Sequence, residues 1–376
     1  MKRICFITGT RADYGIMAPI MRHVMQSPEL ELQVVATNMH LSERFGNTYK
    51  EIENDGFKIE AKIYSVAADD SASSVVRSMA AVQDGLSKIL PEIKPDLVVI
   101  LGDRYEALAS ASAAVTFGIP VAHLHGGEIT QGALDNRYRN AITQLSTYHF
   151  ASTEEYRQRI ISMGCQPDKV FHSGAPGAEP FCFNRQTEEL FNKLTGLKSG
   201  QNFLLLAFHP VTLLNDNGFN ELKATLEGVT PFIEKGWKVL VTMPNSDPGN
   251  LSMRTLLEEW GDGYPKDVVR VDSLGSELFH YAMENAAAMI GNSSAALIEA
   301  PTHCLPTVNV GFRQKGRATG PSVISVEANA ESIRGAIEKA LSSEFRKDIM
   351  SQTLCDRNPY YKKDSSRFIF EKIKNL

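Results

Sequence analysis

The chain has 376 residues, of which 43% are hydrophobic and 22% are charged. The length favours two domains of ordinary size, and the composition excludes disordered and fibrous classes of protein. The 39 basic and 44 acidic residues give a net charge of -5, and no long basic run stands out, so no nucleic-acid partner is expected.

Apolar stretches are short along the sequence, and the mean hydropathy is -0.18. None approaches the ~18–20 apolar residues that a membrane-spanning helix needs, so no membrane partner is expected. The N-terminal apolar run ends at Ile7 and predicts a buried strand, because a signal peptide would need a longer apolar region and a cleavage site. The cysteines are odd in number and form no C-x-x-C pair, which predicts reduced thiols in a cytoplasmic protein, without disulfides or a zinc site. They are Cys5, Cys165, Cys182, Cys304 and Cys355.

Short apolar runs alternate with helical patterns in the first part of the chain. Strands are predicted over Ile4–Thr8, Leu32–Ala36, Asp96–Leu101, Pro120–His125 and Lys169–His172. Helices are predicted over Ile16–Met25, Ser73–Leu90, Glu106–Phe117, Asn136–Ser146 and Glu154–Met163. Apolar strands joined by helical crossovers indicate a parallel sheet covered on both faces. Residues 1–175 are therefore expected to form a doubly wound, Rossmann-like domain.

A Gly/Pro-rich stretch, Gly174–Pro180, predicts a linker, and the pattern then restarts. Strands are predicted over Phe203–Ala207, Lys238–Met243, Val268–Val271, Ala288–Ile290 and Thr307–Val310. Residues 176–360 should form a second Rossmann-like domain. Residues 361–376 add an amphipathic helix over Asp364–Lys374 that can pack back on the first domain. The predicted fold class is α/β, with two doubly wound domains facing a cleft lined by the carboxyl ends of their strands.

Polar side chains follow two predicted strands of the first domain. The turn Thr8–Gly15 begins a helix, where backbone N–H groups can bind an anion. Arg11 and Asp13 would face the cleft there, or form an ordinary surface ion pair. Asp103 and Arg104 are adjacent after the next clear strand and suit a base and a phosphate clamp. The alternative is a helix N-cap aspartate beside a solvent-facing arginine.

The following strand ends in His-Leu-His-Gly-Gly-Glu, with histidines at 123 and 125 and glutamate at 128. Alternation along the strand places both imidazoles on one face. These are metal-ligand types, but no further ligand cluster accompanies them, so an acid/base cluster is preferred and no metal is expected. His123 can instead be a core histidine. Asp135 opens the next helix either as an N-cap or as a second carboxylate opposite Asp103, and spacing leaves both readings open.

The second domain repeats this arrangement. His209 follows one strand, and Asn245 and Asp247 follow the next. The asparagine and aspartate have the chemistry for base or ribose contacts, although ordinary turns use the same residues.

The sharpest local signal in the second domain is Gly291-Asn-Ser-Ser, where a strand ends and Ser293 and Ser294 start a helix. Two hydroxyls and free helix N–H groups make a phosphate cradle. Glu299, expected one to two turns inside that helix, could take both hydroxyls of a ribose. Arg313 and Arg317 add positive charge after the following strand. The alternative is a plain N-capped helix and a basic loop.

These motifs, in this order, resemble the hydrolysing UDP-N-acetylglucosamine 2-epimerases of sialic-acid and legionaminic-acid synthesis nearly end to end. The matching motifs are Gly9–Gly15, Met39-His40, Phe45–Thr48, Gly102–Arg104, His125–Glu128, His209-Pro210, Pro244–Asp247, Gly291–Ser294 and Arg313–Arg317. The resemblance implies the glycosyltransferase-B architecture of two facing Rossmann-like domains. It also implies that a UDP-2-acetamido sugar, UDP-GlcNAc or UDP-N,N'-diacetylbacillosamine, is converted with water into UDP and the free 2-epimeric sugar.

The resemblance assigns roles to individual residues. The UDP-contacting positions are Arg11, Gly15, Arg104, His209, Asn245, Asp247, Ser293, Ser294, Glu299 and Arg313. The catalytic positions are Asp103, His125, Glu128 and Asp135, and the sugar-side positions are Asp13, His40, Arg139 and Arg317.

This chain departs from the family pattern on the sugar side. His125 stands where animal members and some bacterial ones have glutamate, whereas other bacterial members, including ones acting on bacillosamine-type sugars, have histidine. Asn140 stands where the family usually has histidine, and one residue is inserted between Glu128 and Asp135 relative to the glutamate-bearing members.

The implied reaction removes the C2 proton while UDP leaves C1, forms a glycal, and adds water with the opposite configuration at C2. Asp103, Asp135 or a neutral His125 could act as the base. No metal or nicotinamide is required, so no cofactor is expected. The alternatives are a non-hydrolysing 2-epimerase giving UDP-N-acetylmannosamine, a glycosyltransferase, and a non-catalytic regulator that binds a nucleotide sugar. The resemblance also implies a homo-oligomer, a dimer or a tetramer.

Overall fold

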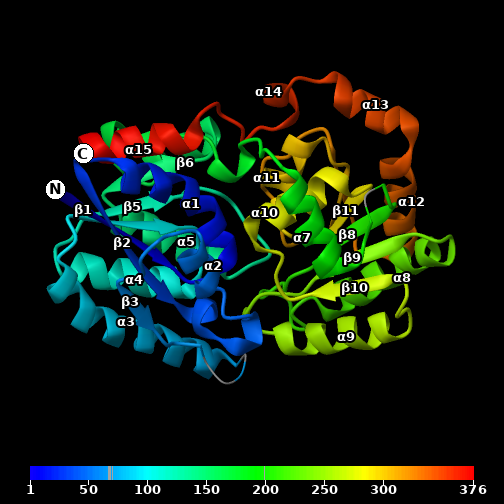
Figure 1. Cartoon of the computed structure of the whole chain (residues 1–376), viewed down its shortest axis with the longest axis horizontal. Coiled ribbons are helices and arrows are strands. Elements are labelled where there is room, and N and C mark those ends of the chain that lie inside the picture. The colour runs from blue at the N-terminus through cyan, green and yellow to red at the C-terminus, as the bar shows by residue number, and fades with distance from the viewer. Residues whose placement is uncertain (67–68, 70, 199) are drawn as a thin grey trace. The chain divides into compact units, whose positions relative to one another are not determined.

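The computed structural model describes residues 1–66, 69, 71–198 and 200–376. These residues form two compact units, each built on one parallel sheet (Figure 1). Unit 1 comprises Met1–Glu128, Leu134–Gly177 and Tyr360–Leu376. Unit 2 comprises Ile129–Ala133 and Ala178–Pro359.

The sheet of unit 1 has seven parallel strands in the order β3-β2-β1-β4-β5-β6-β7. Its strands are β1 (Lys2–Thr8), β2 (Leu30–Thr37), β3 (Ala61–Ile63), β4 (Leu97–Leu101), β5 (Val121–Leu124), β6 (Tyr148–Ala151) and β7 (Val170–His172). Its helices are α1 (Arg11–Gln26), η1 (Asn38–Leu41), η2 (Glu43–Phe45), α2 (Tyr49–Asn54), α3 (Ala72–Ile93), α4 (Tyr105–Thr116), α5 (Asp135–Leu145), α6 (Glu154–Ser162), η3 (Pro167–Lys169) and α15 (Ser365–Asn375). The strand order reverses between β1 and β4, the position at which doubly wound sheets bind ligands.

Strand β1 shows how the sequence sets the two faces of this sheet. Ile4 and Phe6 belong to one buried cluster, which includes residues of α1 and α15. Cys5 and Ile7 belong to another, which includes residues of α3 and α4. Because successive side chains of a strand point to opposite faces, a continuous apolar run is buried on both sides, as the sequence predicts.

The sheet of unit 2 has six parallel strands in the order β10-β9-β8-β11-β12-β13. Its strands are β8 (Phe203–Ala207), β9 (Lys238–Thr242), β10 (Val268–Val271), β11 (Ala288–Gly291), β12 (Thr307–Val310) and β13 (Val323–Val326). Its helices are α7 (Arg185–Thr195), α8 (Phe219–Glu234), α9 (Asn250–Asp262), α10 (Gly275–Asn285), α11 (Ala295–Ile298), η5 (Ala300–His303), α12 (Ala330–Leu341), α13 (Ser343–Ser351) and α14 (Leu354–Arg357). A further turn, η4 (Pro176–Ala178), lies where the chain passes from unit 1 to unit 2.

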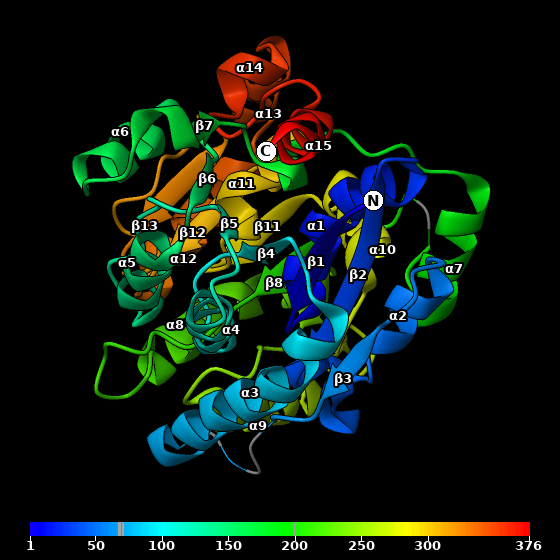
Figure 2. The same cartoon turned by 90° about the vertical axis from the view of Figure 1, so that its left-hand side faces the viewer.

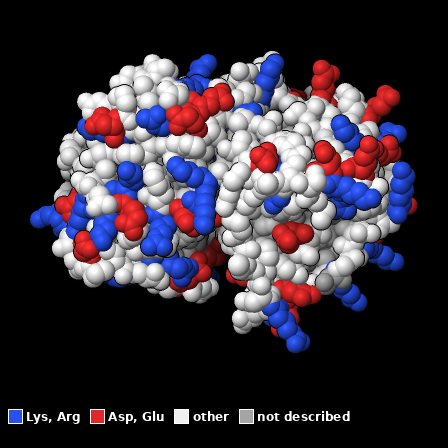
Figure 3. Space-filling view, turned by 90° about the horizontal axis from the view of Figure 1, so that it is seen from above, with Lys and Arg blue, Asp and Glu red and all other residues white. Residues whose placement is uncertain are grey.

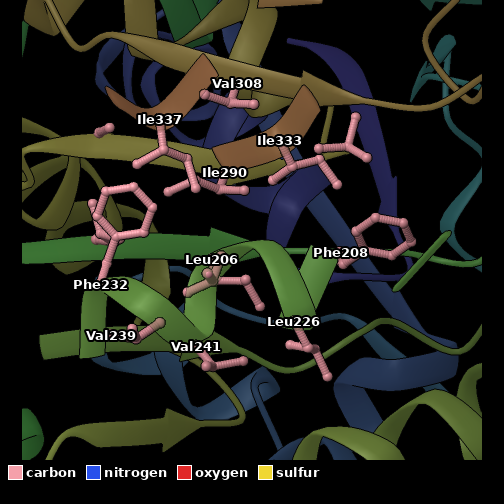
Figure 4. Packing of buried hydrophobic residues seen from close by; sticks show 14 of the residues in the cluster. Leu206, Phe208, Leu226, Phe232, Val239, Val241, Ile290, Val308, Ile333 and Ile337 are labelled. Atoms are coloured by element: carbon pink, nitrogen blue, oxygen red, sulfur yellow. The ribbon is translucent and has the colours of Figure 1, made fainter. Parts of the chain in front are cut away.

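The core of unit 2 combines strand and helix side chains, as Figure 4 shows for Leu206 of β8, Val241 of β9 and Ile290 of β11. Ile333 and Ile337, one turn apart on α12, pack into the same cluster. The doubly wound fold predicted for each part of the chain is therefore confirmed.

The sequence did not predict strands β3, β6 and β13. They have three or four residues each, and β3 and β13 are edge strands with partly exposed side chains. Such short strands give too few alternations for a pattern to be recognised.

The last helix belongs to unit 1, although unit 2 precedes it in the sequence. Figures 1 and 2 show α15 beside α1. Ile369 and Ile373 are fully buried in the cluster that includes α1. The predicted linker is also buried in part, since Ala175 donates its N–H to the carbonyl of Tyr360.

Charges of both signs are interspersed on the face shown in Figure 3, in keeping with the small net charge. Across the part of the chain that the structure describes, no helix combines the length and hydrophobicity that a membrane crossing demands.

Candidate functional site

The first cluster of candidate site residues lies where β4 and β5 end and α5 begins. His125, just after β5, brings its Nδ1 to 2.8 Å from Glu128 Oε1. The same carboxylate oxygen accepts the Ser152 hydroxyl at 2.7 Å. Because a carboxylate only accepts, a neutral imidazole here carries its proton on Nδ1 and its lone pair on Nε2. That Nε2 is buried and meets no hydrogen-bond partner among the described residues, so it is available to take a proton from a ligand.

The backbone of His125 is strained. Its φ of 63° is left-handed, which is uncommon for a residue with a side chain. Gly127, at φ 77°, continues the turn, and a Cβ there would lie 2.6 Å from the carbonyl oxygen of Tyr156. Such strain persists only where the surroundings enforce it, and it is concentrated at functional sites.

His123 has a structural role. Its Nε2 donates to the carbonyl of Gly102 at 2.7 Å, and its Nδ1 lies 3.3 Å from the Thr143 hydroxyl. Burial lowers the pKa of His123 to about 3. The structure therefore favours the interpretation of His123 as a core histidine whose ring nitrogens are bonded within the protein. Within the described ranges, no group of three or more His, Cys, Asp or Glu side chains is arranged to hold a metal ion.

Arg139 joins the rest of this cluster. Its Nη2 donates to Asp103, and its Nη1 donates to the carbonyl of Glu128 at 2.9 Å. The arginine is 1% exposed, while the Asp103 side chain keeps 19% of its surface exposed. The N-cap of α4 is Arg104, without a side-chain capping bond, so the N-cap reading of Asp103 is wrong. Asp103 is instead a charged group paired with Arg139.

Asp135 is the first residue of α5, whose N-cap is Leu134. The N-cap position is therefore held by Leu134, and the N-cap reading of Asp135 is also wrong. Asp135 and Arg139 are four residues apart on one helix and therefore share a face. This face is the one that meets Asp103 and the carbonyl of Glu128.

The turn after β1 is held by Asp13, which accepts the Thr8 hydroxyl at 2.5 Å and the N–H groups of Gly9 and Thr10. Thr10 and Asp13 form a capping box at the start of α1. Burial raises the pKa of Asp13, against the lowering effect of these hydrogen bonds. Arg11 and Gly15 lie in the first two turns of α1.

His40 is buried, and both of its ring nitrogens are bonded within the protein. Nε2 lies 2.9 Å from the Thr8 hydroxyl, and Nδ1 lies 2.8 Å from the Thr48 hydroxyl. Burial lowers the pKa of His40 to about 4. These contacts hold the turn after β1, and the sugar-side position of His40 stays a prediction.

Glu106 is a residue that the sequence reasoning missed. It lies behind the turn after β1, where a Cβ on Gly9 would meet its side chain at 2.7 Å. Its Oε1 accepts from Arg104 Nε at 2.5 Å, while Oε2 is buried without a hydrogen-bond partner among the described residues. Burial raises the pKa of Glu106, and Arg104 opposes that effect. The only signal in the sequence was its place two residues after Arg104.

In unit 2, Asn292 connects three loops, and the sequence reasoning did not single it out as a site residue. Its side chain exchanges two hydrogen bonds with the backbone of His209, at 2.7 and 2.8 Å. Its carbonyl accepts from Arg313 Nη1 at 3.1 Å and from Gln314 at 2.8 Å. Arg313 Nε also donates to the carbonyl of Pro210 at 3.2 Å. The loops after β8, β11 and β12 are therefore locked together, with Arg313 buried as part of the clamp.

The helix expected after Gly291 is shorter than predicted. Helix α11 covers Ala295–Ile298, with Ser294 as its N-cap, and Ser293 Oγ accepts the N–H of Ala295 at 3.3 Å. Glu299 is the C-cap of this single turn, so the prediction that it lies inside a longer helix is wrong. Burial raises the pKa of Glu299 to about 7.

Asn245 and Asp247 lie in the turn after β9. Asn245 Oδ1 accepts the N–H of Asp247 at 3.3 Å, and the carbonyl of Asp247 accepts from the Asn250 side chain at 2.8 Å. These bonds build the turn, and they show why sequence alone could not separate a turn residue from a ribose contact.

The segment Ile129–Ala133 leaves unit 1 after Glu128 and is part of unit 2. Arg317 Nε donates to the carbonyl of Ile129 at 3.3 Å, and the N–H of Gln131 donates to the carbonyl of Lys315 at 3.3 Å. Arg317, predicted on the sugar side, therefore holds the segment that connects Glu128 with Asp135.

A protein-family model described as UDP-N-acetylglucosamine 2-epimerase matches residues 22–374. The chain is 35% identical over 348 residues to a Campylobacter jejuni protein named GDP/UDP-N,N'-diacetylbacillosamine 2-epimerase (hydrolyzing), covering 92% of this chain and 89% of that one. It is 35% identical over 343 residues to UDP-N,N'-diacetylbacillosamine 2-epimerase (hydrolyzing) of Legionella pneumophila, covering 91% and 89%.

Among solved structures, UDP-GlcNAc 2-epimerase from Neisseria meningitidis bound to UDP-GlcNAc superposes with a TM-score of 0.81. The identity is 17%, and the match covers 100% of both chains. At this identity the likeness shows the fold, and it confirms the predicted glycosyltransferase-B class.

Proposed function

The chain belongs to the UDP-N-acetylglucosamine 2-epimerase family, and from this premise we propose that it is a hydrolysing 2-epimerase acting on a UDP-2-acetamido sugar. UDP-N,N'-diacetylbacillosamine is the first candidate substrate and UDP-GlcNAc the second. The names of two relatives at 35% identity support the first, as does a histidine at position 125 in place of glutamate.

One observation carries the proposal: the lone-pair nitrogen of His125 is buried and unpartnered among the described residues, and Glu128 holds the opposite nitrogen. A base must present a lone pair in a water-poor place, and a carboxylate on the other nitrogen fixes that tautomer. Glu128 is thus suited to orienting the imidazole rather than to touching the sugar.

The first step of the proposed reaction breaks the C2–H and C1–O bonds, forms a C1=C2 double bond and releases UDP. His125 takes the C2 proton. Asp103 stabilises the positive charge that develops at C1. Water then adds its hydroxyl to C1, and Asp135 in its protonated form delivers its proton to the opposite face of C2. The proton that the water gives up restores Asp135, and His125 returns the C2 proton to solvent. The products are UDP and the free 2-epimeric sugar.

The nucleotide is assigned to unit 2. Ser293 and Ser294 offer hydroxyls to the diphosphate, Arg313 offers positive charge, and Glu299 accepts from the ribose hydroxyls. Asn292 supports this assignment because it fixes the relative positions of the loops that carry these groups.

The test is to incubate the protein with each of the two nucleotide sugars in D2O. Release of UDP together with a free 2-epimeric sugar carrying deuterium at C2 is the expected result. Formation of the epimeric nucleotide sugar without release of UDP would identify the non-hydrolysing reaction. Tight binding of UDP with no turnover of either substrate would identify a nucleotide-sugar-binding regulator.

The same proposal includes the setting of the reaction. All five cysteines are free thiols, which supports a reducing compartment, the cytoplasm. We also propose that the free sugar is used in sialic-acid or legionaminic-acid synthesis. The protein is proposed to form a dimer or a tetramer, and sedimentation velocity would measure this oligomeric state.

A further inference from the structure

Unit 2 contains a row of four titratable side chains, of which the proposed reaction uses only the first. Glu299 Oε2 lies 3.5 Å from His280 Nε2. His280 Nδ1 lies 2.9 Å from His303 Nε2. His303 Nδ1 lies 2.7 Å from Glu284 Oε2. Each imidazole therefore presents one nitrogen to each neighbour, and the row is continuous between two carboxyl groups.

The two ends of the row lie in different environments. The His280 and His303 side chains are 4% and 3% exposed, and Glu299 is 14% exposed. Glu284, one helical turn after His280 on α10, is 53% exposed. Phe181 stacks on His280 with ring centroids 4.0 Å apart. The row thus leads from the assigned ribose carboxylate through two water-poor imidazoles to a carboxylate in solvent.

Hydrogen-bond polarity gives this row two arrangements with the same number of protons. In the first, Glu299 is protonated and each histidine carries its proton on Nδ1. In the second, Glu299 is ionised, His280 carries its proton on Nε2, and His303 carries protons on both nitrogens. The first becomes the second when one proton moves from Glu299 to His280 and another moves from His280 to His303. Glu284 stays ionised throughout.

We propose that His280, His303 and Glu284 form a proton relay that lets Glu299 ionise when a nucleotide ribose binds, by storing its proton on His303 beside Glu284. The inference rests on the proposed assignment of Glu299 to the ribose. An ionised carboxylate accepts from both ribose hydroxyls, whereas a protonated one has given up part of its acceptor capacity. His280, His303 and Glu284 are positioning residues, since they act through Glu299.

The charges around the row agree with this scheme. Burial raises the pKa of Glu299 to about 7, so at neutral pH the carboxyl holds a proton about half of the time, and this proton must leave when an ionised carboxylate is needed. Burial, and then His303, lower the pKa of His280 to about 3, so His280 is neutral in both arrangements. The hydrogen bond from His303 lowers the pKa of Glu284, and the nearby Arg357 acts in the same direction.

The test compares the affinities for UDP and 2'-deoxy-UDP between pH 6 and pH 8. The two nucleotides carry the same diphosphate, so the ratio of affinities cancels phosphate titration and isolates the ribose contact. In the wild type we expect a preference for UDP that stays constant, because the proton moves within the protein. In His303→Gln the amide cannot store a proton, so the preference should fall about tenfold from pH 8 to pH 6, as Glu299 protonates with a pKa near 7.

Glu284→Gln tests the exposed end of the row without altering a buried side chain, and it should show a smaller change in the same direction. Glu259→Gln, an exposed carboxylate on α9, is the matched control and should behave as the wild type. Calorimetry in buffers of different ionisation enthalpy should show proton release on UDP binding at pH 7 in His303→Gln, and none in the wild type.

Two results would overturn the relay, and they differ in whether the assignment of Glu299 to the ribose is overturned as well. If His303→Gln and Glu284→Gln both keep the wild-type ratio at every pH, the relay is wrong and the nucleotide assignment stands. If the wild type binds both nucleotides equally well, Glu299 does not meet the ribose, and that part of the proposed function falls with the relay.

Discussion

The hydrogen bond between His125 and Glu128 predicts how substitutions of Glu128 and of its neighbour Ser152 change kcat. Glu128→Gln keeps the size of the side chain, but its amide can rotate to donate to Nδ1, which would move the imidazole proton to Nε2 and remove the lone pair. We expect kcat for the UDP-sugar to fall by at least ~10²-fold, the usual effect of losing a general base, with KM nearly unchanged. Ser152→Ala removes the hydroxyl that donates to Glu128 and leaves the bond between Glu128 and His125, so kcat should fall less than ~10-fold. Equal losses in both variants would contradict the tautomer argument.

Asp103 offers a second test of the cluster. Asp103→Asn keeps an oxygen that can accept from Arg139, but it removes the negative charge. We expect kcat to fall by at least ~10²-fold, while UDP affinity is unchanged because Asp103 is not assigned to the nucleotide. Single-turnover assays and UDP titration measure the two quantities. Wild-type turnover would show that Asp103 serves only to pair the buried arginine.

His40 makes a pH-dependent contribution to stability. Its pKa is about 4 in the folded protein and about 6.5 in the unfolded chain, so the unfolded state binds more protons between these values. The contribution is therefore fully present above pH 6.5 and is lost as the pH falls, by ~1.4 kcal/mol per pH unit down to about pH 4. Urea unfolding of His40→Gln at several pH values should show a free-energy difference from the wild type that shrinks on acidification. A constant difference would contradict this.

At the scale of elements, the sequence predicted the apolar strands of both sheets but missed the short strands β3, β6 and β13. Leu204–Leu206 and Val239–Val241 are continuous apolar runs buried on both faces, and such runs are recognisable without a structure. Positions directly after strands were also recognisable as candidate site positions, because parallel sheets gather their carboxyl ends. The hydrogen-bond partners of those residues could not be predicted. The bond between Asn292 and His209 spans 83 residues, and no local pattern encodes such a distance.

The segment Ile129–Ala133 belongs to unit 2, but in the sequence it joins Glu128 to the helix that begins at Asp135. It follows Glu128 directly and ends two residues before Asp135, while its contacts lie on the loop of Arg313. A Cβ at Gly132 would lie 2.6 Å from Arg313 Cα, so one of the two loops must move.

For Gly132→Ala we therefore expect kcat/KM to fall about tenfold, which corresponds to ~1.4 kcal/mol, within the range for overpacking. Steady-state kinetics and UDP titration would measure the loss. Gly335→Ala is the matched control, because a Cβ there meets nothing within 4 Å and alanine favours the helix. Unchanged kinetics in Gly132→Ala would show that the segment tolerates displacement.

At the scale of the whole molecule, unit 1 is completed by the last residues of the chain. Helix α15 is separated from the rest of unit 1 by the residues of unit 2. Its buried isoleucines therefore make contacts of very high sequence separation, whose loop-closure cost grows only slowly with the length of the intervening chain. The sequence predicted an amphipathic helix here that can pack back on the first domain, but amphipathicity alone does not say which side chains cover its apolar face.

We expect Ile369→Ala to destabilise unit 1 by ~2–5 kcal/mol, the cost of truncating a fully buried isoleucine to alanine. Hydrogen exchange should locate the effect: protection should fall in β1, β2 and β4, while β8, β9 and β11 keep theirs, since the cluster around Ile369 belongs to unit 1 alone. Arg367→Ala, on the exposed face of the same helix, controls for changes in helix propensity. Loss of protection in both units would show that they unfold as one cooperative body, and unchanged protection would show that the core of unit 1 forms without its last helix.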